Sequence, residues 1–362
     1  MTRLGERIAA LIAATGPIGI ADYMALCLFD PEEGYYTTRE PFGTAGDFTT
    51  APEISQMFGE LCAVWLHAAW QAGGAPERPL IAEIGPGRGT LMKDMLRTLA
   101  RLDTLLSAEA RVFMIETSPR LTQVQKATLA GAPVAPDWVS AVGDLPDGPL
   151  FIIGNELFDA VPIRQYVKTA TGWRERVVGL DGEARLAFLA GPGAPDPALL
   201  PPDAPGAPEG AIAEIAPART ALMQEIATRI ARRGGAGLFI DYGYAKPATG
   251  DTLQAMRGHA YADILAEPGQ ADLTAHVDFS ALSDAARDQG LAAHLLTQGD
   301  FLLGLGLLQR AGRLGAGKDA AEQDAIGAAV ERLAGPQAMG TLFKVLAIAP
   351  STATVPPFST SD

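Results

Sequence analysis

Short apolar runs alternate with helical patterns through the middle of the chain. The first run, residues 80–84, precedes a glycine-rich turn and an amphipathic pattern over 90–105. Further apolar runs cover 112–115, 138–142 and 150–154. Apolar runs joined by helical crossovers are typical of parallel strands. The sequence therefore predicts an α/β fold with a doubly wound, mostly parallel sheet that has helices on both faces.

The N-terminal part has helical rather than strand periodicity. Leu4, Ile8 and Leu11 recur at helical spacing between charged residues, which predicts an amphipathic helix over 4–14 instead of a signal peptide. A second helix is expected to begin at Thr50, because Thr50 and Glu53 have the spacing of a capping box. Residues 1–75 are thus predicted to form an N-terminal helical segment.

Beyond Pro162 the pattern becomes two-residue alternation. The runs 164–168, 173–178 and 185–188 are separated by Thr-Gly and Asp-Gly turns, which predicts a β-meander inserted into the sheet. Residues 191–217 contain eight prolines and four glycines, so they are expected to form an exposed loop. The predicted domains are 1–75, then 76–350 with an insertion at about 163–217, and a disordered tail over 351–362.

Charge and cysteine content restrict the class of protein. The net charge is −14 and the pI is near 4.8, whereas nucleic-acid binding requires a concentrated Lys/Arg surface. Cys27 and Cys62 have no metal-ligand spacing. No stretch approaches the ~20 apolar residues that span a bilayer. We therefore expect a cytoplasmic protein with a protein substrate, without nucleic acid, a bound metal or membrane insertion, and leave the oligomeric state open.

A glycine-rich turn joins the first predicted strand to its helix. Glu83 precedes Gly85, Gly87, Gly89 and Thr90 in a G-x-G-x-G pattern. Glycines at a strand-to-helix turn allow a nucleotide-like ligand to approach the backbone closely. A carboxylate there would attract a sulfonium amino acid and repel a pyrophosphate. All five residues are predicted to bind the cofactor, although a turn that only packs the helix on the strand remains an alternative.

Acidic residues also follow the next two predicted strands. Glu116 comes directly after the second strand, where its two oxygens can accept both hydroxyls of a ribose. Asp144 follows the third strand and is a candidate contact for an adenine amino group. Either acid could instead be an ordinary solvated residue.

The segment 155–162 follows the fourth apolar run and carries two acids. Glu156 and Asp159 can hold a planar guanidinium while one of its nitrogens faces a methyl donor, and Asn155 is expected at the cofactor. His276 could take the departing proton because imidazole titrates near neutral pH. The alternatives are acids that stabilise a helix N-terminus and a structural histidine.

Several of these segments together resemble the MidA-type S-adenosylmethionine-dependent methyltransferases, relatives of a mitochondrial complex I assembly factor. The similarity is carried by 46–55, the glycine turn, 155–162, 240–244 and 271–279. It implies a class I methyltransferase sheet of seven strands and S-adenosyl-L-methionine as cofactor. Gly85, Gly87 and Gly89 would lie at the cofactor and Glu116 at its ribose, and residues 47–55 would close over the site.

The leading hypothesis is a protein methyltransferase that adds methyl groups to an arginine of a respiratory complex I subunit or a similar protein. A second hypothesis is an assembly chaperone that keeps the fold without catalysis. A third is a nicotinamide-dependent oxidoreductase, which Glu83 and the position of the third glycine disfavour.

Overall fold

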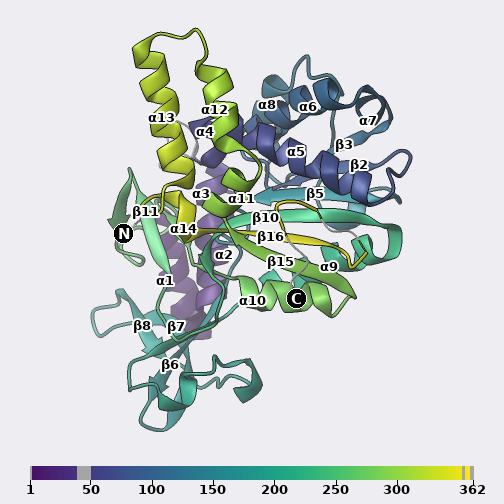
Figure 1. The fold of residues 1–362 in the computed structure, drawn as a ribbon. Coiled ribbons are helices and arrows are strands. Elements are labelled where there is room, and N and C mark those ends of the chain that lie inside the picture. The colour runs from purple at the N-terminus through teal and green to yellow at the C-terminus, as the bar shows by residue number, and fades with distance from the viewer. Residues whose placement is uncertain (1, 39–49, 353–354, 359–362) are drawn as a thin grey trace. The chain divides into compact units, whose positions relative to one another are not determined.

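The chain divides into two compact units, and each is described by itself. A computed structural model describes residues 2–38, 50–352 and 355–358, and Figure 1 shows its ribbon. Both units are assembled from segments that are distant in the sequence. One unit comprises Met1–Phe48, Phe158–Ala221 and Lys246–Asp278, and the other comprises Thr49–Leu157, Leu222–Ala245 and Phe279–Asp362.

The second unit is built on a mixed sheet with the strand order β15-β16-β10-β5-β2-β3-β4. From β10 to β4 all neighbours are parallel, and β16 is antiparallel to both β10 and β15. The strands are β2 (Leu80–Ile84), β3 (Arg111–Ile115), β4 (Asp137–Val139), β5 (Leu150–Asn155), β10 (Gly235–Tyr244), β15 (Leu291–Thr297) and β16 (Phe343–Pro350).

The strand order reverses between β2 and β5. After β2 the chain builds outward through β3 and β4, and it then returns to place β5 on the other side of β2. In open parallel sheets such a reversal leaves a crevice at the carboxyl ends of the two strands, where ligands bind. The glycine turn after β2 and the segment after β5 therefore lie at this position.

Helices cover the sheet of the second unit on both faces, as Figure 1 shows for α5, α6 and α8 on one face and α9 and α10 on the other. β2 and β5 are buried at every position, which explains their continuous apolar sequences. The helices are α4 (Ala51–Ile54), α5 (Gln56–Ala72), α6 (Thr90–Leu102), α7 (Thr104–Glu109), α8 (Pro119–Thr128), α9 (Pro217–Arg233) and α10 (Phe279–Arg287).

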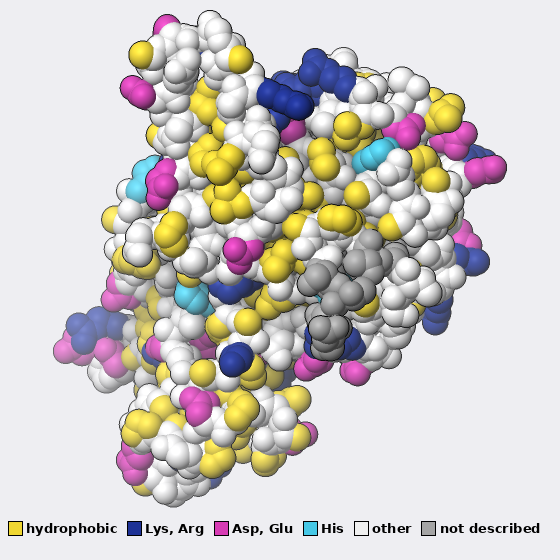
Figure 2. All heavy atoms as spheres, in the orientation of Figure 1, with side chains coloured by type: hydrophobic (Ala, Val, Ile, Leu, Met, Phe, Trp, Pro, Cys, Tyr) yellow, Lys and Arg dark blue, Asp and Glu magenta, His cyan; other side chains and the backbone are white. Residues whose placement is uncertain are grey.

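A helical insert connects β15 to β16. It consists of α11 (Gln298–Gly304), α12 (Leu307–Gly315), α13 (Ala320–Ala334) and α14 (Met339–Leu342). Leu303, Leu308 and Leu342 of this insert are exposed. On the face that Figure 2 shows, acidic, basic and hydrophobic side chains are interspersed.

The first unit combines the N-terminal helices with two small sheets. The apolar faces of its first two helices form a core with residues from both sheets, including Leu4, Ile8, Val178 and Leu273. The larger sheet has the order β1-β7-β6-β9 with β8 paired to β7, and the smaller has the order β12-β11-β13. The elements are α1 (Arg3–Thr15), β1 (Ile18–Gly19), α2 (Ile20–Phe29), α3 (Tyr35–Thr38), β6 (Arg164–Thr169), β7 (Gly172–Leu180), β8 (Leu186–Ala190), β9 (Ile212–Ile215), β11 (Gln254–Arg257), β12 (Ala260–Ala262), β13 (Asp272–Thr274) and β14 (Val277–Asp278).

Two sequence predictions about local structure are wrong. The helix expected from Thr50 is interrupted at Ser55, whose hydroxyl caps α5 by accepting from the Met57 amide at 3.2 Å, and Thr50 makes no side-chain cap. The proline-rich segment 191–217 contains β9, because the last residues before α9 are free of proline and pair with β6.

The α/β sheet itself was predicted correctly, and strands form at each of the alternating runs between 164 and 188. The count of seven strands and the closure of residues 47–55 over the site stay predictions, and residues 47–49 lie outside the described part of the chain. Among the helices in that part, none is both long and apolar enough to cross a bilayer.

Candidate functional site

The glycine turn after β2 has a backbone that side chains would disfavour. Gly85, Gly87 and Gly89 have φ angles of 65°, 50° and 81°, all in the left-handed region where a Cβ is costly. The turn is tight, since the Gly89 amide donates to the Pro86 carbonyl at 2.7 Å, and α6 begins directly after it. A ligand can therefore approach bare backbone and a helix N-terminus at the same place.

Glu83 is buried beneath this turn. Its side chain is 3% exposed and accepts a hydrogen bond from the Met92 amide in the first turn of α6. Burial raises the pKa of Glu83 to about 8, and the Met92 amide opposes this shift. Oε2 of Glu83 has no hydrogen-bond partner among the described residues. The structure thus places Glu83 where it holds the start of α6, and its predicted contact with the cofactor stays a prediction.

Because its pKa is raised, Glu83 is expected to lower the stability of the folded state in a way that depends on pH. Because its folded pKa lies above its ordinary value of 4.5, stability is greatest when the carboxyl is protonated in both states, and it is lost as the pH rises from about 4.5 through about 8. Glu83→Gln stays neutral and keeps an oxygen for the Met92 amide. We expect the variant to be more stable than the wild type at pH 9, with the difference shrinking toward pH 5, in urea unfolding across that range.

The exposed Glu109 of α7 provides the matched control. Glu109→Gln should leave the pH dependence of unfolding unchanged. A difference between Glu83→Gln and wild type that is the same at pH 5 and pH 9 would show that Glu83 does not titrate in this range.

A buried hydrogen-bond network orients Glu116 at the end of β3. Oε1 of Glu116 accepts from the Ser118 amide at 2.7 Å, and Oε2 accepts from Nε2 of Gln125 at 2.9 Å. The same nitrogen donates to the Gly87 carbonyl at 2.9 Å, and Oε1 of Gln125 accepts from Nε1 of Trp138 at 2.9 Å. One glutamine, 0% exposed, therefore ties the glycine turn, Glu116 and β4 together.

The carboxylate oxygens of Glu116 can still accept hydrogen bonds from a ligand. Burial raises its pKa, while hydrogen bonds from the Ser118 amide and Gln125 oppose that rise. Each of its oxygens has a fixed donor and a further lone pair. Glu116 can thus accept from two neighbouring hydroxyls, as the ribose prediction requires.

Sequence reasoning missed Gln125, Trp138 and Glu53. Gln125 had a signal, because it lies between Leu121 and Leu129 on the buried face of α8, where a polar residue needs partners. Glu53 does not act in a capping box. Its Oε1 instead accepts from the Thr90 hydroxyl at 2.5 Å, so the hydroxyl predicted to bind the cofactor contacts Glu53.

Asp144 lies just after β4, in the short 3-10 helix η1 (Val142–Asp144). Its Oδ2 accepts from the Ala141 amide at 3.0 Å, and the residue is exposed. It therefore lies beyond the carboxyl end of a parallel strand, and its contact with adenine stays a prediction.

Asn155 is the last residue of β5, and Glu156 follows it in an unusual backbone conformation. Glu156 has a φ of 50°, a left-handed backbone that costs energy for a residue with a Cβ. It is held there because its amide donates to the Ile240 carbonyl of β10 at 2.8 Å. Nδ2 of Asn155 donates to Oε1 of Glu156 at 3.0 Å. Strain of this kind at the edge of a sheet is typical of functional positions.

The carboxamide oxygen of Asn155 is an acceptor that a ligand could use. Oδ1 is buried and has no hydrogen-bond partner among the described residues. Buried polar atoms are rarely left unpaired, so this oxygen fits a donor supplied by a bound molecule. The ammonium group of an amino-acid ligand would be such a donor.

Asp159 and His276 belong to the first unit, in which their backbones are held close to each other. Asp159 is 6% exposed, its Oδ1 accepts from the Ala160 amide at 2.9 Å, and its carbonyl accepts from the Ala275 amide at 3.1 Å. The amide of His276 donates to the Thr252 hydroxyl at 2.9 Å. Among the described residues, no group of His, Cys, Asp and Glu is placed to hold a metal ion.

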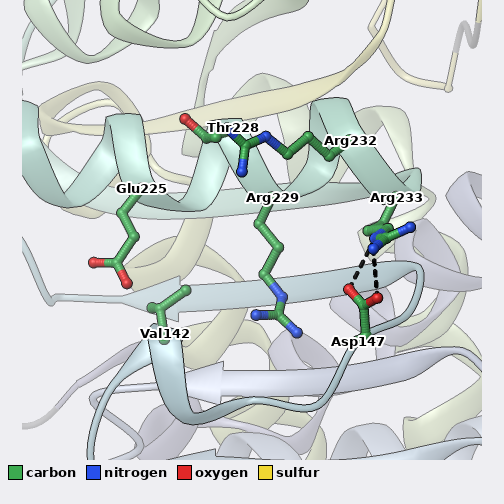
Figure 3. Close-up of a pocket in the computed structure, with 8 residues that line it drawn as sticks. Val142, Asp147, Glu225, Thr228, Arg229, Arg232 and Arg233 are labelled. Carbon is green, nitrogen blue, oxygen red and sulfur yellow. Dashed lines mark hydrogen bonds and ion pairs between the residues drawn. The ribbon is translucent and has the colours of Figure 1, made fainter.

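A surface hollow of about 350 Å³ beside α9 contains none of the predicted site residues. In Figure 3, Arg229 extends from α9 toward the strands and Arg233 pairs with Asp147. Nη2 of Arg229 donates to the Leu145 carbonyl at 2.9 Å. These arginines hold the segment between β4 and β5 against α9. Their positive charges also stabilise the C-terminal half of α9 by interacting with the helix dipole.

Comparison with known proteins identifies a family and several relatives that are similar to this chain. Residues 61–297 match the family described as "Putative S-adenosyl-L-methionine-dependent methyltransferase". The protein arginine methyltransferase NDUFAF7 of Danio rerio is 35% identical, covering 95% of this chain and 86% of that protein. Its counterpart from Mus musculus is 36% identical, covering 94% and 82%.

This chain is also similar to the crystal structure of a likely methyl transferase from Burkholderia thailandensis, which is bound to S-adenosyl-homocysteine. The two chains superpose with a TM-score of 0.83 and are 29% identical in sequence. The likeness covers 97% of this chain and 93% of that one. The relatives from Danio rerio and Mus musculus are named as mitochondrial proteins, and this finding contradicts the predicted cytoplasmic location.

Proposed function

This chain belongs to the S-adenosyl-L-methionine-dependent methyltransferase family, and from that premise we propose that it methylates an arginine side chain of a protein. The predicted family, fold class, enzyme class and cofactor are confirmed. The arginine acceptor is supported by the curated relatives of this chain, which are named protein arginine methyltransferases. The structural observation that carries the proposal is the strained Glu156 at the switch point of the sheet.

The cofactor supplies an electrophilic methyl group on a positively charged sulfur. On the proposed assignment, Gly85, Gly87 and Gly89 admit it close to the backbone. Glu116, oriented by Gln125, accepts its ribose hydroxyls, and Oδ1 of Asn155 accepts from its ammonium group. Each assignment uses a free acceptor or a bare backbone of this chain.

Glu156 acts on the acceptor side in this proposal. Its carboxylate orients a guanidinium and stabilises the positive charge that develops on the acceptor nitrogen. Asp159 provides a second carboxylate for the same group. His276 accepts the proton that the guanidinium releases after methylation. Because arginine stays protonated at neutral pH, carboxylates that hold the guanidinium and a base that takes its proton favour it as an acceptor.

The acceptor is proposed to be a subunit of respiratory complex I or a similar protein, as the resemblance of the sequence implies. The test uses S-adenosyl-L-methionine with a labelled methyl group and extract from cells that lack this enzyme. Label is expected in a protein band, and acid hydrolysis of that band should release methylated arginine. Label on lysine or only on small molecules would contradict the arginine assignment.

A further inference from the structure

Arg219 is a buried arginine in the first turn of α9. It is only 2% exposed, so its positive charge is almost completely removed from water. The N-terminus of a helix is also the end at which a positive charge is least favourable. A charge in this position is costly unless dense hydrogen bonding compensates it.

Four hydrogen bonds to main-chain carbonyls contribute to this compensation. Nε of Arg219 donates to Val161 at 3.1 Å, and Nη1 donates to His276 at 2.7 Å. Nη2 donates to both Asp159 at 2.9 Å and Ala275 at 3.1 Å. One guanidinium therefore joins residues 159–161 to residues 275–276, which are separated by more than a hundred positions in the chain.

A second, partly buried ionisable residue supports the same segments. Glu214 of β9 accepts from the Thr252 hydroxyl at 2.5 Å, and that hydroxyl in turn accepts from the His276 amide at 2.9 Å. Burial raises the pKa of Glu214, whereas its hydrogen bonds and the charge of Arg219 lower it. The backbone of residues 275–276 is thus fixed from two sides.

We propose that Arg219 is a positioning residue for the acceptor side of the reaction. It fixes the backbone of Asp159 and His276 relative to each other through hydrogen bonds to their carbonyls. Its loss should weaken the productive binding of the acceptor protein and leave cofactor binding intact. The proposal rests on the proposed function of Asp159 and His276.

Lysine cannot replace this arrangement. The guanidinium is a rigid planar fork whose nitrogens point in fixed directions, whereas an ammonium group is a single point of charge. Arg219→Lys keeps the charge but can bridge fewer of the four carbonyls. The substitution therefore separates the geometry of the contact from its charge.

The experiment compares Arg219→Lys with two controls in the first unit, to which the first turn of α9 also belongs. Arg185→Lys changes an exposed arginine, and Val178→Ala removes buried side-chain volume from the same hydrophobic core without removing a hydrogen bond of Arg219. Methyl transfer is measured with labelled S-adenosyl-L-methionine against increasing amounts of extract from cells lacking the enzyme. Calorimetry gives the Kd of the cofactor, and hydrogen exchange reports on the Ala275 and His276 amides.

For Arg219→Lys we expect an apparent acceptor KM raised at least about tenfold, a cofactor Kd within twofold of wild type, and at least tenfold faster exchange of both amides. Neither control should show this combination. An unchanged KM, or a rise that Val178→Ala reproduces at equal loss of stability, would overturn the proposal.

A milder variant covers the case in which Arg219→Lys does not fold. Thr252→Val removes one bond to His276 and should raise the acceptor KM by a smaller factor, again without weakening cofactor binding. If the wild type transfers no label, the proposed function fails. Hydrogen exchange then decides the positioning role, because slow exchange of both amides in Arg219→Lys would refute it.

Discussion

Glu156→Gln is expected to lower kcat for methyl transfer at least about a hundredfold, about 2.7 kcal/mol in activation free energy. The side-chain amide of glutamine keeps an oxygen that can accept from Nδ2 of Asn155. Glutamine also has a Cβ, so the φ of 50° costs the same as in the wild type. It loses the negative charge that would orient a guanidinium and stabilise its developing charge. The Kd of S-adenosyl-L-methionine should stay within threefold of wild type.

Kinetics with labelled cofactor and calorimetry of the same preparation test this expectation. Glu225→Gln is a matched control, because Glu225 is an exposed acid of α9 in the same unit. Transfer at the wild-type rate by Glu156→Gln would remove Glu156 from the reaction. If a variant without transfer still supported assembly of the partner complex in cells, a chaperone role would exist beside the enzyme activity.

Gln125→Leu is expected to raise the Kd of S-adenosyl-L-methionine at least tenfold, about 1.4 kcal/mol. Leucine fills a similar volume but leaves the Gly87 carbonyl, Oε2 of Glu116 and Nε1 of Trp138 without a partner. Unpaired buried groups should also lower the free energy of unfolding by about 2 to 4 kcal/mol. Glu116 would lose the donor that sets its orientation.

Gln123 offers a control on the same helix, since it is exposed. Gln123→Leu should change neither cofactor affinity nor stability. Calorimetric titration and urea unfolding of both variants provide the measurements. A folded Gln125→Leu protein with wild-type affinity would show that the network does not organise the cofactor site.

The candidate site was predictable where function depends on short sequence patterns next to strands. The Gly85 to Gly89 turn and the residues after β5 were found because a parallel sheet brings the carboxyl ends of its strands to one edge. The network through Gln125 was not predicted, because a single glutamine on a helix does not reveal its partners. Glu53 was assigned to a local cap, whereas in the structure it bonds to Thr90, 37 positions away.

Arg219 shows most clearly why long-range contacts escape sequence reasoning. Arg219 lies in the first turn of α9, and nothing in the sequence indicates that its guanidinium is buried among carbonyls. The same limit applies to β9, whose four residues form a strand because β6 supplies the hydrogen bonds. Strand pairing and burial depend on partners that lie far away along the chain.

The sequence by itself determined the alternation of strands and helices, the glycine turn and the family resemblance, because periodicity and short motifs are local properties of a chain. Only the tertiary structure decided that Glu83 supports a helix, that Gln125 orients Glu116 and that Glu156 is strained. These features arise from burial and from hydrogen bonds between distant segments, and their energies exist only once the chain has folded.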